Sequence, residues 1–183
     1  MRRWISLILV LGLTGCFTLG GWSQLKGNEY KDWSCKFKAM VPKDWMRLNA
    51  VNYFMITKDG MKLDYIAVKR FRFKDKLEKT KKQFSQDMTP PELAEVEIDN
   101  NKADDSIQNF KLTDNKPVTI AGQPGFCLEY NYSTADGLPM RGIHYGFLNK
   151  VWVYRIRYEA TTQHYFEKYK QDFEKFIQSF QLI

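Results

Sequence analysis

Cysteine and histidine are the residue types in this sequence most able to do chemistry, and both are scarce. The chain has Cys16, Cys35 and Cys127, together with His144 and His164. A zinc site needs several such ligands at close and regular spacing. These five residues are scattered along the chain without that spacing. The sequence therefore predicts no metal site and no other cofactor.

Motifs of the common enzyme classes do not occur in the sequence either. There is no Gly-x-Ser-x-Gly elbow, Walker loop, His-Glu-x-x-His pair or dinucleotide-binding glycine pattern. His144 lies on a predicted strand that could approach Arg155, Arg157 and Glu129, and such a group could serve acid–base catalysis. Cross-strand pairing on a solvated sheet face explains the same residues more simply. We therefore predict that the protein is not an enzyme, and a hydrolase built around His144 is kept as an alternative.

The first cysteine ends a stretch with the composition of an export signal. Two arginines at positions 2 and 3 precede an apolar run at positions 4–13, the pattern of a secretory signal peptide. That run is shorter than the roughly 20 apolar residues of a bilayer-spanning helix. Leu-Thr-Gly-Cys at positions 13–16 resembles the lipobox of bacterial lipoproteins, in which the cysteine thiol is acylated and cleavage falls just before it. The alternative is an ordinary signal peptide, or a short anchor, with a chance cysteine.

These features divide the chain into three predicted parts. Residues 1–15 are a lipoprotein signal peptide, residues 16–28 are the lipidated Cys16 and a glycine-containing tether, and residues 29–183 are a single domain. Two or three acyl chains on Cys16 would hold the protein stably to membrane lipid. Residue 17 is phenylalanine, so the aspartate that commonly retains lipoproteins at the inner membrane is missing. We expect a bacterial cell envelope protein, on the outer membrane and facing the periplasm.

The net charge of +7 suits an anionic lipid surface or an acidic protein partner. Nucleic acid also attracts basic proteins, but an exported lipoprotein rarely meets it, so we expect no nucleic-acid partner. The densest positive charge lies in one run, and its candidate contacts with an anionic surface are Lys69, Arg70, Arg72, Lys74 and Lys76. The alternative is a solvated strand end and helix face.

Alternation of apolar and polar residues predicts strands at 30–41, 53–57 and 61–73, and several more between 107 and 159. Helices are expected at 74–88, from Thr89 onward with Pro90 at its first position, and after Thr161 or Thr162 at the end of the chain. The last of these has aromatic residues at three- and four-residue steps and must lie on a sheet. The expected fold is α+β, an antiparallel sheet of about six or seven strands with helices packed on its faces.

The two remaining cysteines could form a disulfide in an oxidising compartment. Strand alternation puts Cys35 on the face of Trp33 and Phe37, and turns Cys127 away from Phe126. Opposite faces would separate the two Cβ atoms by more than the about 4.5 Å that a disulfide tolerates. We expect two free thiols.

Three short motifs in this order are similar to those of one known fold. They are Phe-Lys-Ala-Met-Val-Pro-Lys-Asp-Trp at 37–45, Gly-Gln-Pro-Gly-Phe at 122–126 and Phe-Ile-Gln-Ser-Phe at 176–180. Over residues 32–182 the chain resembles the PsbP/Mog-like fold, and most of all its lipobox-bearing bacterial members such as the DcrB-like lipoproteins. The resemblance implies an α/β/α sandwich and protein binding without catalysis. It assigns no catalytic residues, because the matched positions belong to turns and core.

Two functions of different classes remain open on the sequence alone. The first is a membrane-anchored, non-enzymatic module that binds an envelope protein as an assembly or chaperone-like factor. The second is a lipoprotein that binds a small ligand or an ion in a pocket between sheet and helices. An open apolar groove would favour the first function, and a closed cavity with convergent polar groups would favour the second.

Overall fold

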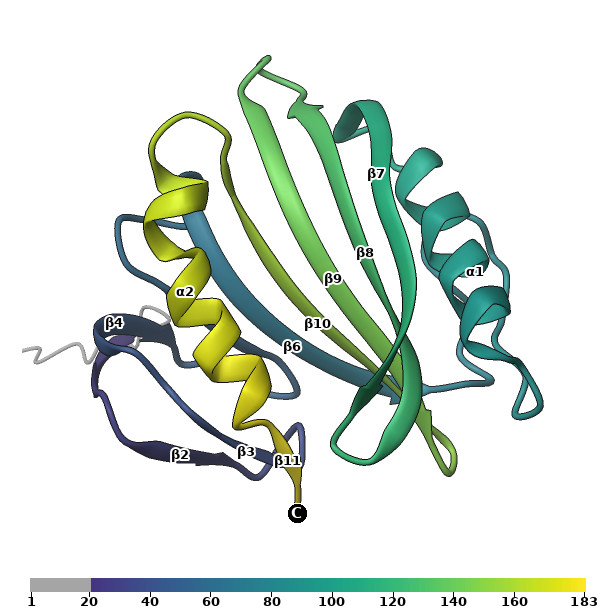
Figure 1. The fold of residues 1–183 in the computed structure, drawn as a ribbon, viewed down its shortest axis with the longest axis horizontal. Helices are drawn as coiled ribbons and strands as arrows, with labels where there is room; N and C mark the ends of the chain where they lie inside the picture. Colours follow the sequence, from purple (N-terminus) through teal and green to yellow (C-terminus); the bar gives the residue numbers. More distant parts are fainter. Residues whose placement is uncertain (1–20) are drawn as a thin grey trace, which may run out of the picture.

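The computed structural model describes residues 21–183, so the predicted signal peptide and Cys16 lie outside the described residues. Its main feature is an eight-stranded antiparallel sheet (Figure 1). From one edge to the other its strands are β1 (Trp22–Lys26), β4 (Lys43–Leu48), β5 (Phe54–Thr57), β6 (Asp64–Arg72), β10 (Trp152–Thr161), β9 (Pro139–Asn149), β8 (Gln123–Thr134) and β7 (Ile107–Ile120). The sheet has more strands than the six or seven expected.

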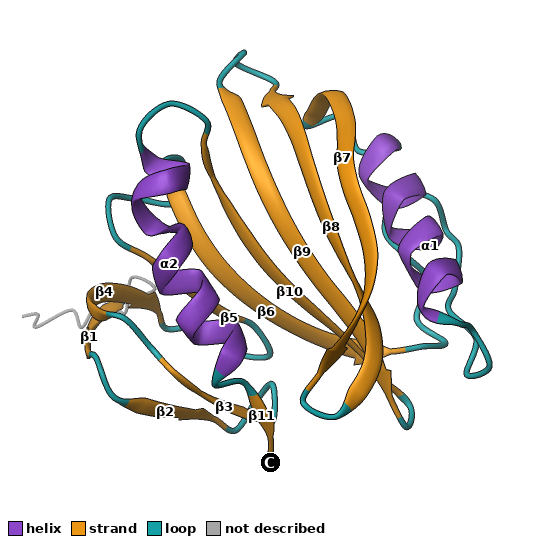
Figure 2. Ribbon diagram, viewed as in Figure 1, coloured by secondary structure: helices purple, strands orange, loops and turns teal. Residues whose placement is uncertain are grey.

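Two helices cover opposite faces of this sheet (Figure 2). Helix α1 (Pro90–Lys102) packs on β7, β8 and β9, and helix α2 (Tyr165–Gln178) packs on β10 and β6. A second sheet with the order β11-β3-β2 lies beside α2, and its strands are β2 (Glu29–Asp32), β3 (Phe37–Met40) and β11 (Gln181–Leu182). The predicted α+β architecture with helices on both faces is confirmed. Neither helix in the described part of the chain is long and apolar enough to cross a membrane.

The aromatic stripe of the terminal helix forms the centre of the core, as predicted. Phe166, Tyr169, Phe173 and Phe176 are all buried on the inner side of α2. The Phe173 ring stacks on Tyr158 of β10, with the ring centroids 5.2 Å apart. Because aromatic residues bury large areas at regular helical steps, this stripe fixes which side of α2 meets the sheet.

The end of α2 ties the two sheets together through the Ser-Phe pair of the third motif. The Ser179 hydroxyl accepts a hydrogen bond of 2.8 Å from the backbone N–H of Met40 on β3. The Phe180 ring stacks on Phe37 of the same strand, with centroids 4.9 Å apart. The motif therefore has a structural role, joining a polar contact to an aromatic one.

Helix α1 starts where its sequence predicts. Thr89 is the N-cap residue, and its backbone N–H donates to the Glu92 carboxylate at 2.7 Å, as in a capping box. The inner side of this helix is unusual in that it is only partly apolar. Leu93 and Val96 are buried there, but so are three polar residues nearer the C-terminus, Glu97, Asn100 and Asn101.

The helix predicted at 74–88 does not form. Leu77 and Phe84 are buried as expected, yet the segment is a coil held by backbone hydrogen bonds such as Leu77 N–H to Lys82 O and Phe84 N–H to Phe73 O. Lys81 has a positive φ of 58°. A helix in a protein gains most of its stability by packing an apolar face on its neighbours. The segment at 74–88 has too few apolar residues to form such a face.

Three other boundaries differ from the prediction. The strand expected at 30–41 is divided into β2 and β3, because the Asp32 carboxylate accepts hydrogen bonds from Ser34 Oγ at 2.6 Å and Cys35 N–H at 2.7 Å and makes a turn. The expected tether at 16–28 contains β1, which is paired with β4. Helix α2 begins after His164 and not at a threonine cap, because β10 continues to Thr161.

The edge strand β7 is long, and most of its residues are exposed. Its register with β8 shifts between Gln108 and Lys111 and again between Leu112 and Asp114, so it carries two bulges. Pro117 also lies on this strand, which is tolerated because the outer side of an edge strand has no partner.

Cys35 and Cys127 are free thiols, as predicted, although the reason given by the sequence is wrong. Both side chains lie in the core cluster beneath α2, on the same side of the large sheet. The Cys35 thiol donates to the Val68 carbonyl of β6 at 3.5 Å, whereas Cys127 is on β8. Three strand spacings separate β6 from β8, roughly 14 Å, which no disulfide can span.

We predict that Phe176→Ala lowers the free energy of unfolding by about 3–5 kcal/mol, because it leaves a cavity where the rings of Phe37 and Phe54 meet α2. Urea denaturation followed by circular dichroism measures the loss. Gln171→Ala, at an exposed position of the same helix, is the matched control and should change stability by less than about 0.5 kcal/mol. Equal effects of the two changes would contradict the placement of α2 in the core.

Candidate functional site

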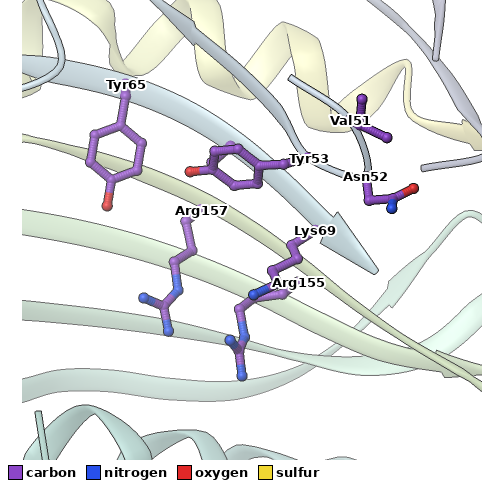
Figure 3. Close-up of a pocket in the computed structure, with 8 residues that line it drawn as sticks. Val51, Asn52, Tyr53, Tyr65, Lys69, Arg155 and Arg157 are labelled. Carbon is purple, nitrogen blue, oxygen red and sulfur yellow. The ribbon is translucent and has the colours of Figure 1, made fainter. Parts of the chain in front are cut away.

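Two adjoining hollows open on the α1 side of the large sheet, with volumes of about 530 and 520 Å³. Both are lined by Lys69 of β6 and by Arg155 and Arg157 of β10. We call the two hollows together the arginine groove. The first hollow is bordered by the loop that carries Val51, Asn52 and Tyr53 (Figure 3), and the second lies under the coil at 73–89 and the C-terminal half of α1.

The alternation of β10 explains how the two arginines reach this site. Tyr154, Ile156 and Tyr158 point into the core beneath α2, so Arg155 and Arg157 point to the α1 side. Arg155 and Arg157 thus share the face of β10 opposite to its aromatic residues. That face was expected to be solvated, but α1 and the coil at 73–89 cover part of it, and the arginine side chains are only 14% and 19% exposed.

Helix α1 supplies the charge that neutralises these arginines. The Glu97 carboxylate, 1% exposed, accepts hydrogen bonds from Arg155 Nη2 at 2.6 Å and Nε at 3.0 Å, and it lies 3.7 Å from Arg157 Nη2. Arg157 Nη2 also donates to Asn101 Oδ1 at 2.9 Å. Breaking such a buried pair by removing one partner costs about 3–5 kcal/mol, because the remaining charge is uncompensated. This cluster therefore fixes α1 on the sheet.

A second carboxylate lies deeper, next to Arg157. Glu159 is 2% exposed and accepts hydrogen bonds from three phenol groups: Tyr130 at 2.5 Å, Tyr132 at 2.6 Å and Tyr65. The Glu159 carboxylate also lies 3.8 Å from Nη1 of Arg157. Burial, and then the negative charge of Glu159, raise the pKa of Tyr130 and Tyr65 well above the usual value. The three tyrosines therefore remain neutral donors at physiological pH.

Lys69 is the cation of the first hollow that has no such partner among the described residues. Its side chain is exposed, and none of the ion pairs within residues 21–183 includes it. In the register of β6 and β10 it lies directly opposite Arg155. Like charges directly opposite each other on one face of a sheet are destabilising. The first hollow therefore has a positive charge in excess of what Glu97 and Glu159 neutralise.

His144 is not part of an acid–base group. It is fully buried and opposite Arg157 in the register, as expected, but Glu129 lies on the other face and pairs with Arg141 at 3.3 Å. The His144 ring packs edge-on against Phe126, and neither ring nitrogen has a hydrogen-bond partner. Burial, together with the charges of Arg157 and Arg155, holds the pKa of His144 well below its usual value. The residue is a neutral core histidine that lines neither hollow.

The predicted basic run is divided between the two faces of β6. Lys69 faces the arginine groove, whereas Arg70 and Arg72 lie over the Trp152 ring on the other face, at 4.3 and 5.8 Å from its centroid. Lys74 and Lys76 follow in the coil after the strand, and Lys76 borders the second hollow. The five residues gather around the end of β6, but they do not form one patch on one face.

The arrangement is suited to holding an anion. In residues 21–183, no group of three His, Cys, Asp or Glu side chains converges as a metal ion would require. The two described cysteines are buried in the core beneath α2. The first hollow is bordered instead by guanidinium, ammonium, amide and phenol groups, and the second also has the carboxylates of Asp75, Glu78 and Asp104 on its border. Guanidinium, ammonium, amide and phenol groups donate hydrogen bonds to oxygen atoms.

No sequence-family model matches the chain, and no curated protein sequence is similar enough to be matched. Solved structures do match. The solution structure of cyanobacterial PsbP (CyanoP) from Synechocystis sp. PCC 6803 has a TM-score of 0.60 at 14% identity, covering 94% of this chain and 99% of that one. The Ran-binding protein Mog1p of Saccharomyces cerevisiae has a TM-score of 0.58 at 10% identity, covering 87% of this chain and 96% of that one.

The fold is PsbP/Mog-like. A third structure, a protein of unknown function (PA94) from Pseudomonas aeruginosa, has a TM-score of 0.51 at 12% identity and covers 80% of this chain and 90% of that one. The resemblance drawn from the three motifs is thereby confirmed for the fold. Identities this low show a PsbP/Mog-like scaffold alone, and the chemistry of the arginine groove has to be argued from this chain's own residues.

Sequence analysis missed most of the groove on this PsbP/Mog-like scaffold. Glu97, Asn100, Asn101 and Glu159 were not among the residues that sequence analysis singled out. The signal that could have found them was Arg155-Ile156-Arg157, two arginines on the hidden side of a strand near the centre of the sheet. Charged residues there need partners, and the nearest helix has to supply them.

We predict that His144 makes stability depend on pH below about 6.5, its unfolded pKa. Its pKa in the folded protein is lowered, so the unfolded chain binds a proton that the native state excludes, and stability is lost as pH falls. Between about pH 7.5 and about pH 5.5 the wild type should lose about 1–1.5 kcal/mol more than His144→Met.

Urea denaturation at several pH values measures this difference. The matched control is His164→Asn, at the exposed residue that precedes α2, and it should keep the wild-type pH dependence. The same pH dependence in His144→Met and the wild type would show that His144 is not excluded from protonation in the native state.

Proposed function

We propose that the protein is a membrane-anchored, non-enzymatic binding module of the bacterial cell envelope, acting on an envelope protein as an assembly or chaperone-like factor. The lipobox-like sequence at Cys16 supports the anchor. The PsbP/Mog-like fold supports the binding role, because Mog1p is described as a Ran-binding protein and uses the same scaffold. The partner would be a protein of the same envelope compartment.

The observation that carries the proposal is the point at which the chain enters the domain. The Gly21 carbonyl accepts a hydrogen bond of 3.0 Å from Asn49 N–H, and β1 begins at the next residue. Cys16 and Gly21 are five residues apart, so their Cα atoms can be at most about 18 Å from each other. A lipid on Cys16 would therefore keep the β1–β4 edge close to the bilayer, and it would not leave the domain free on a long tether.

The loop after β4 continues from that edge toward the basic residues. Val51 in this loop is 84% exposed, and Asn52 borders a shallow hollow together with Arg70, Arg72 and Trp152. Each basic residue near an anionic surface contributes about 1 kcal/mol of attraction. The end of β6 could thus orient the domain on anionic lipid. Because residue 17 is not aspartate, we place the protein on the outer membrane, facing the periplasm.

The second candidate function is binding of a small ligand, and the arginine groove favours it. The groove lies between the sheet and α1, and polar groups from β6, β10 and α1 converge on it. A volume of about 530 Å³ falls in the range of small-molecule sites. This function is compatible with the first, because a bound ligand could be passed to, or sensed by, an envelope partner.

We predict that Cys16→Ser blocks lipidation and moves the protein from the membrane fraction to the soluble fraction, because no acyl chain then holds it. Metabolic labelling with a fatty acid and fractionation after a high-salt wash measure both effects. Cys35→Ser is the matched control and should stay labelled and membrane-bound. A Cys16→Ser protein that retains label and resists the wash would refute the anchor.

We predict that the Cys16→Ser protein binds vesicles rich in anionic lipid at low salt, and that charge reversal of Arg70, Arg72 and Lys74 abolishes this binding. Screening acts over about 8 Å at physiological ionic strength, so binding should fall steeply as salt rises. Vesicle co-sedimentation is the measurement.

The matched control reverses three other exposed lysines, Lys102, Lys111 and Lys175, and so changes the net charge equally. If the two triple variants lose binding to the same degree, the end of β6 has no special role. If the unaltered surface does not bind at all, a protein partner and not the bilayer orients the domain.

A further inference from the structure

We infer that the arginine groove binds a small phosphate-bearing molecule, with the phosphate group between Lys69, Arg155 and Arg157. This inference rests on the second candidate function, ligand binding in the groove, and names the chemistry of the ligand. The three cations come from neighbouring positions of β6 and β10 and border both hollows. They lie side by side although no described carboxylate pairs with Lys69.

The charge of the first hollow favours an anion. Two carboxylates that do not line the first hollow neutralise the two guanidinium groups. Glu97 of α1 pairs with Arg155, and Glu159, among the tyrosines, pairs with Arg157. The first hollow itself is lined by three cations and no carboxylate. Lys69 and Arg155 face each other directly across the strand pair, an arrangement that a bound anion would turn from repulsive to attractive.

The hydrogen-bond donors left over point to an anion with several oxygen atoms. No hydrogen bond of the described residues uses Nη1 of Arg155, although its side chain is held in place by Glu97, while Nη1 of Arg157 lies 3.8 Å from the Glu159 carboxylate. Arg157 Nε and Asn101 Nδ2 are buried donors without partners beside the second hollow. Such donors are costly to leave unpaired. A phosphate can accept from both strands and from α1 at once, whereas a carboxylate has only two oxygens.

The walls of the first hollow indicate what the rest of the ligand is like. Tyr53, Tyr65, Val51 and Ala67 give it aromatic and aliphatic sides around the cations (Figure 3). Burial raises the pKa of Tyr53 to about 12, so this phenol is neutral and does not repel an anion. A short organic group attached to the phosphate would fit between these side chains. The phosphate could belong to a soluble ester or to a phospholipid headgroup, which share this chemistry.

Isothermal titration of the full chain in a non-ionic detergent tests the inference, with glycerol 3-phosphate as the probe. We expect one ligand per chain, and binding about tenfold weaker in Lys69→Glu than in the wild type. Lys69→Gln should lose less, because it removes a charge without adding one. Lys111→Glu, at an exposed position of β7, is the matched control and should bind as the wild type does. A cooperative thermal melt at a temperature no lower than that of the wild type shows that the Lys69 variants fold.

Two further titrations separate the contribution of the phosphate from that of the rest of the probe. Glycerol lacks the phosphate and should not bind, and succinate is an anion that has carboxylates in its place. Succinate binding as tight as glycerol 3-phosphate would overturn the phosphate assignment but leave ligand binding by the groove intact. No binding of either anion, or binding that Lys69→Glu does not weaken, overturns both. Nanodiscs containing phosphatidic acid separate the two sources: binding that requires the nanodisc and weakens in Lys69→Glu supports a headgroup, and binding of glycerol 3-phosphate alone supports a soluble ester.

Discussion

The pairing of Glu97 with Arg155 and Arg157 is the interaction on which the α1 side of the molecule depends. Two guanidinium groups project from the middle of the sheet into a region that a helix covers, and water cannot solvate them fully there. The helix must therefore bring a carboxylate, and it does so on the side where an ordinary helix would have only apolar residues. Replacing the whole group by apolar side chains could leave the protein as stable, so the retention of buried charge suggests a role beyond packing.

The two faces of the large sheet are stabilised by different kinds of interaction. Beneath α2, aromatic rings pack against one another, and Phe37, Phe54 and Phe176 are in mutual contact. On the α1 side, Leu93 and Val96 pack on a smaller apolar cluster of the sheet that includes Phe126 and Leu128, whereas the C-terminal half of α1 buries polar residues. The α1 side is better suited to a binding site. Polar groups there can exchange bound water for a ligand at low cost, whereas a packed aromatic layer cannot open.

The sequence predicted those parts of the fold that have a strong local signal. The aromatic stripe of α2, the capping box at Thr89 and the alternation of β10 are each set by neighbouring residues, and each was located correctly. The coil at 73–89 was mistaken for a helix because Leu77 and Phe84 are spaced as on a helix, but the segment has too few apolar residues to pack a helix face on the sheet. The groove could not be predicted, because Lys69, Glu97 and Arg157 are far apart in the chain and meet only through strand order.

The bulges and charges of β7 have a consequence for how the protein meets other chains. An edge strand offers free backbone groups to any extended peptide. In β7, however, the two register shifts bend the edge, and Lys111, Asp114 and Lys116 place charged side chains along it. Such an edge resists strand addition, the first step of cross-β aggregation. Proteins crowded on a two-dimensional surface meet one another far more often than in solution. If the domain is anchored to a membrane as proposed, this edge would let many copies lie side by side without pairing their sheets.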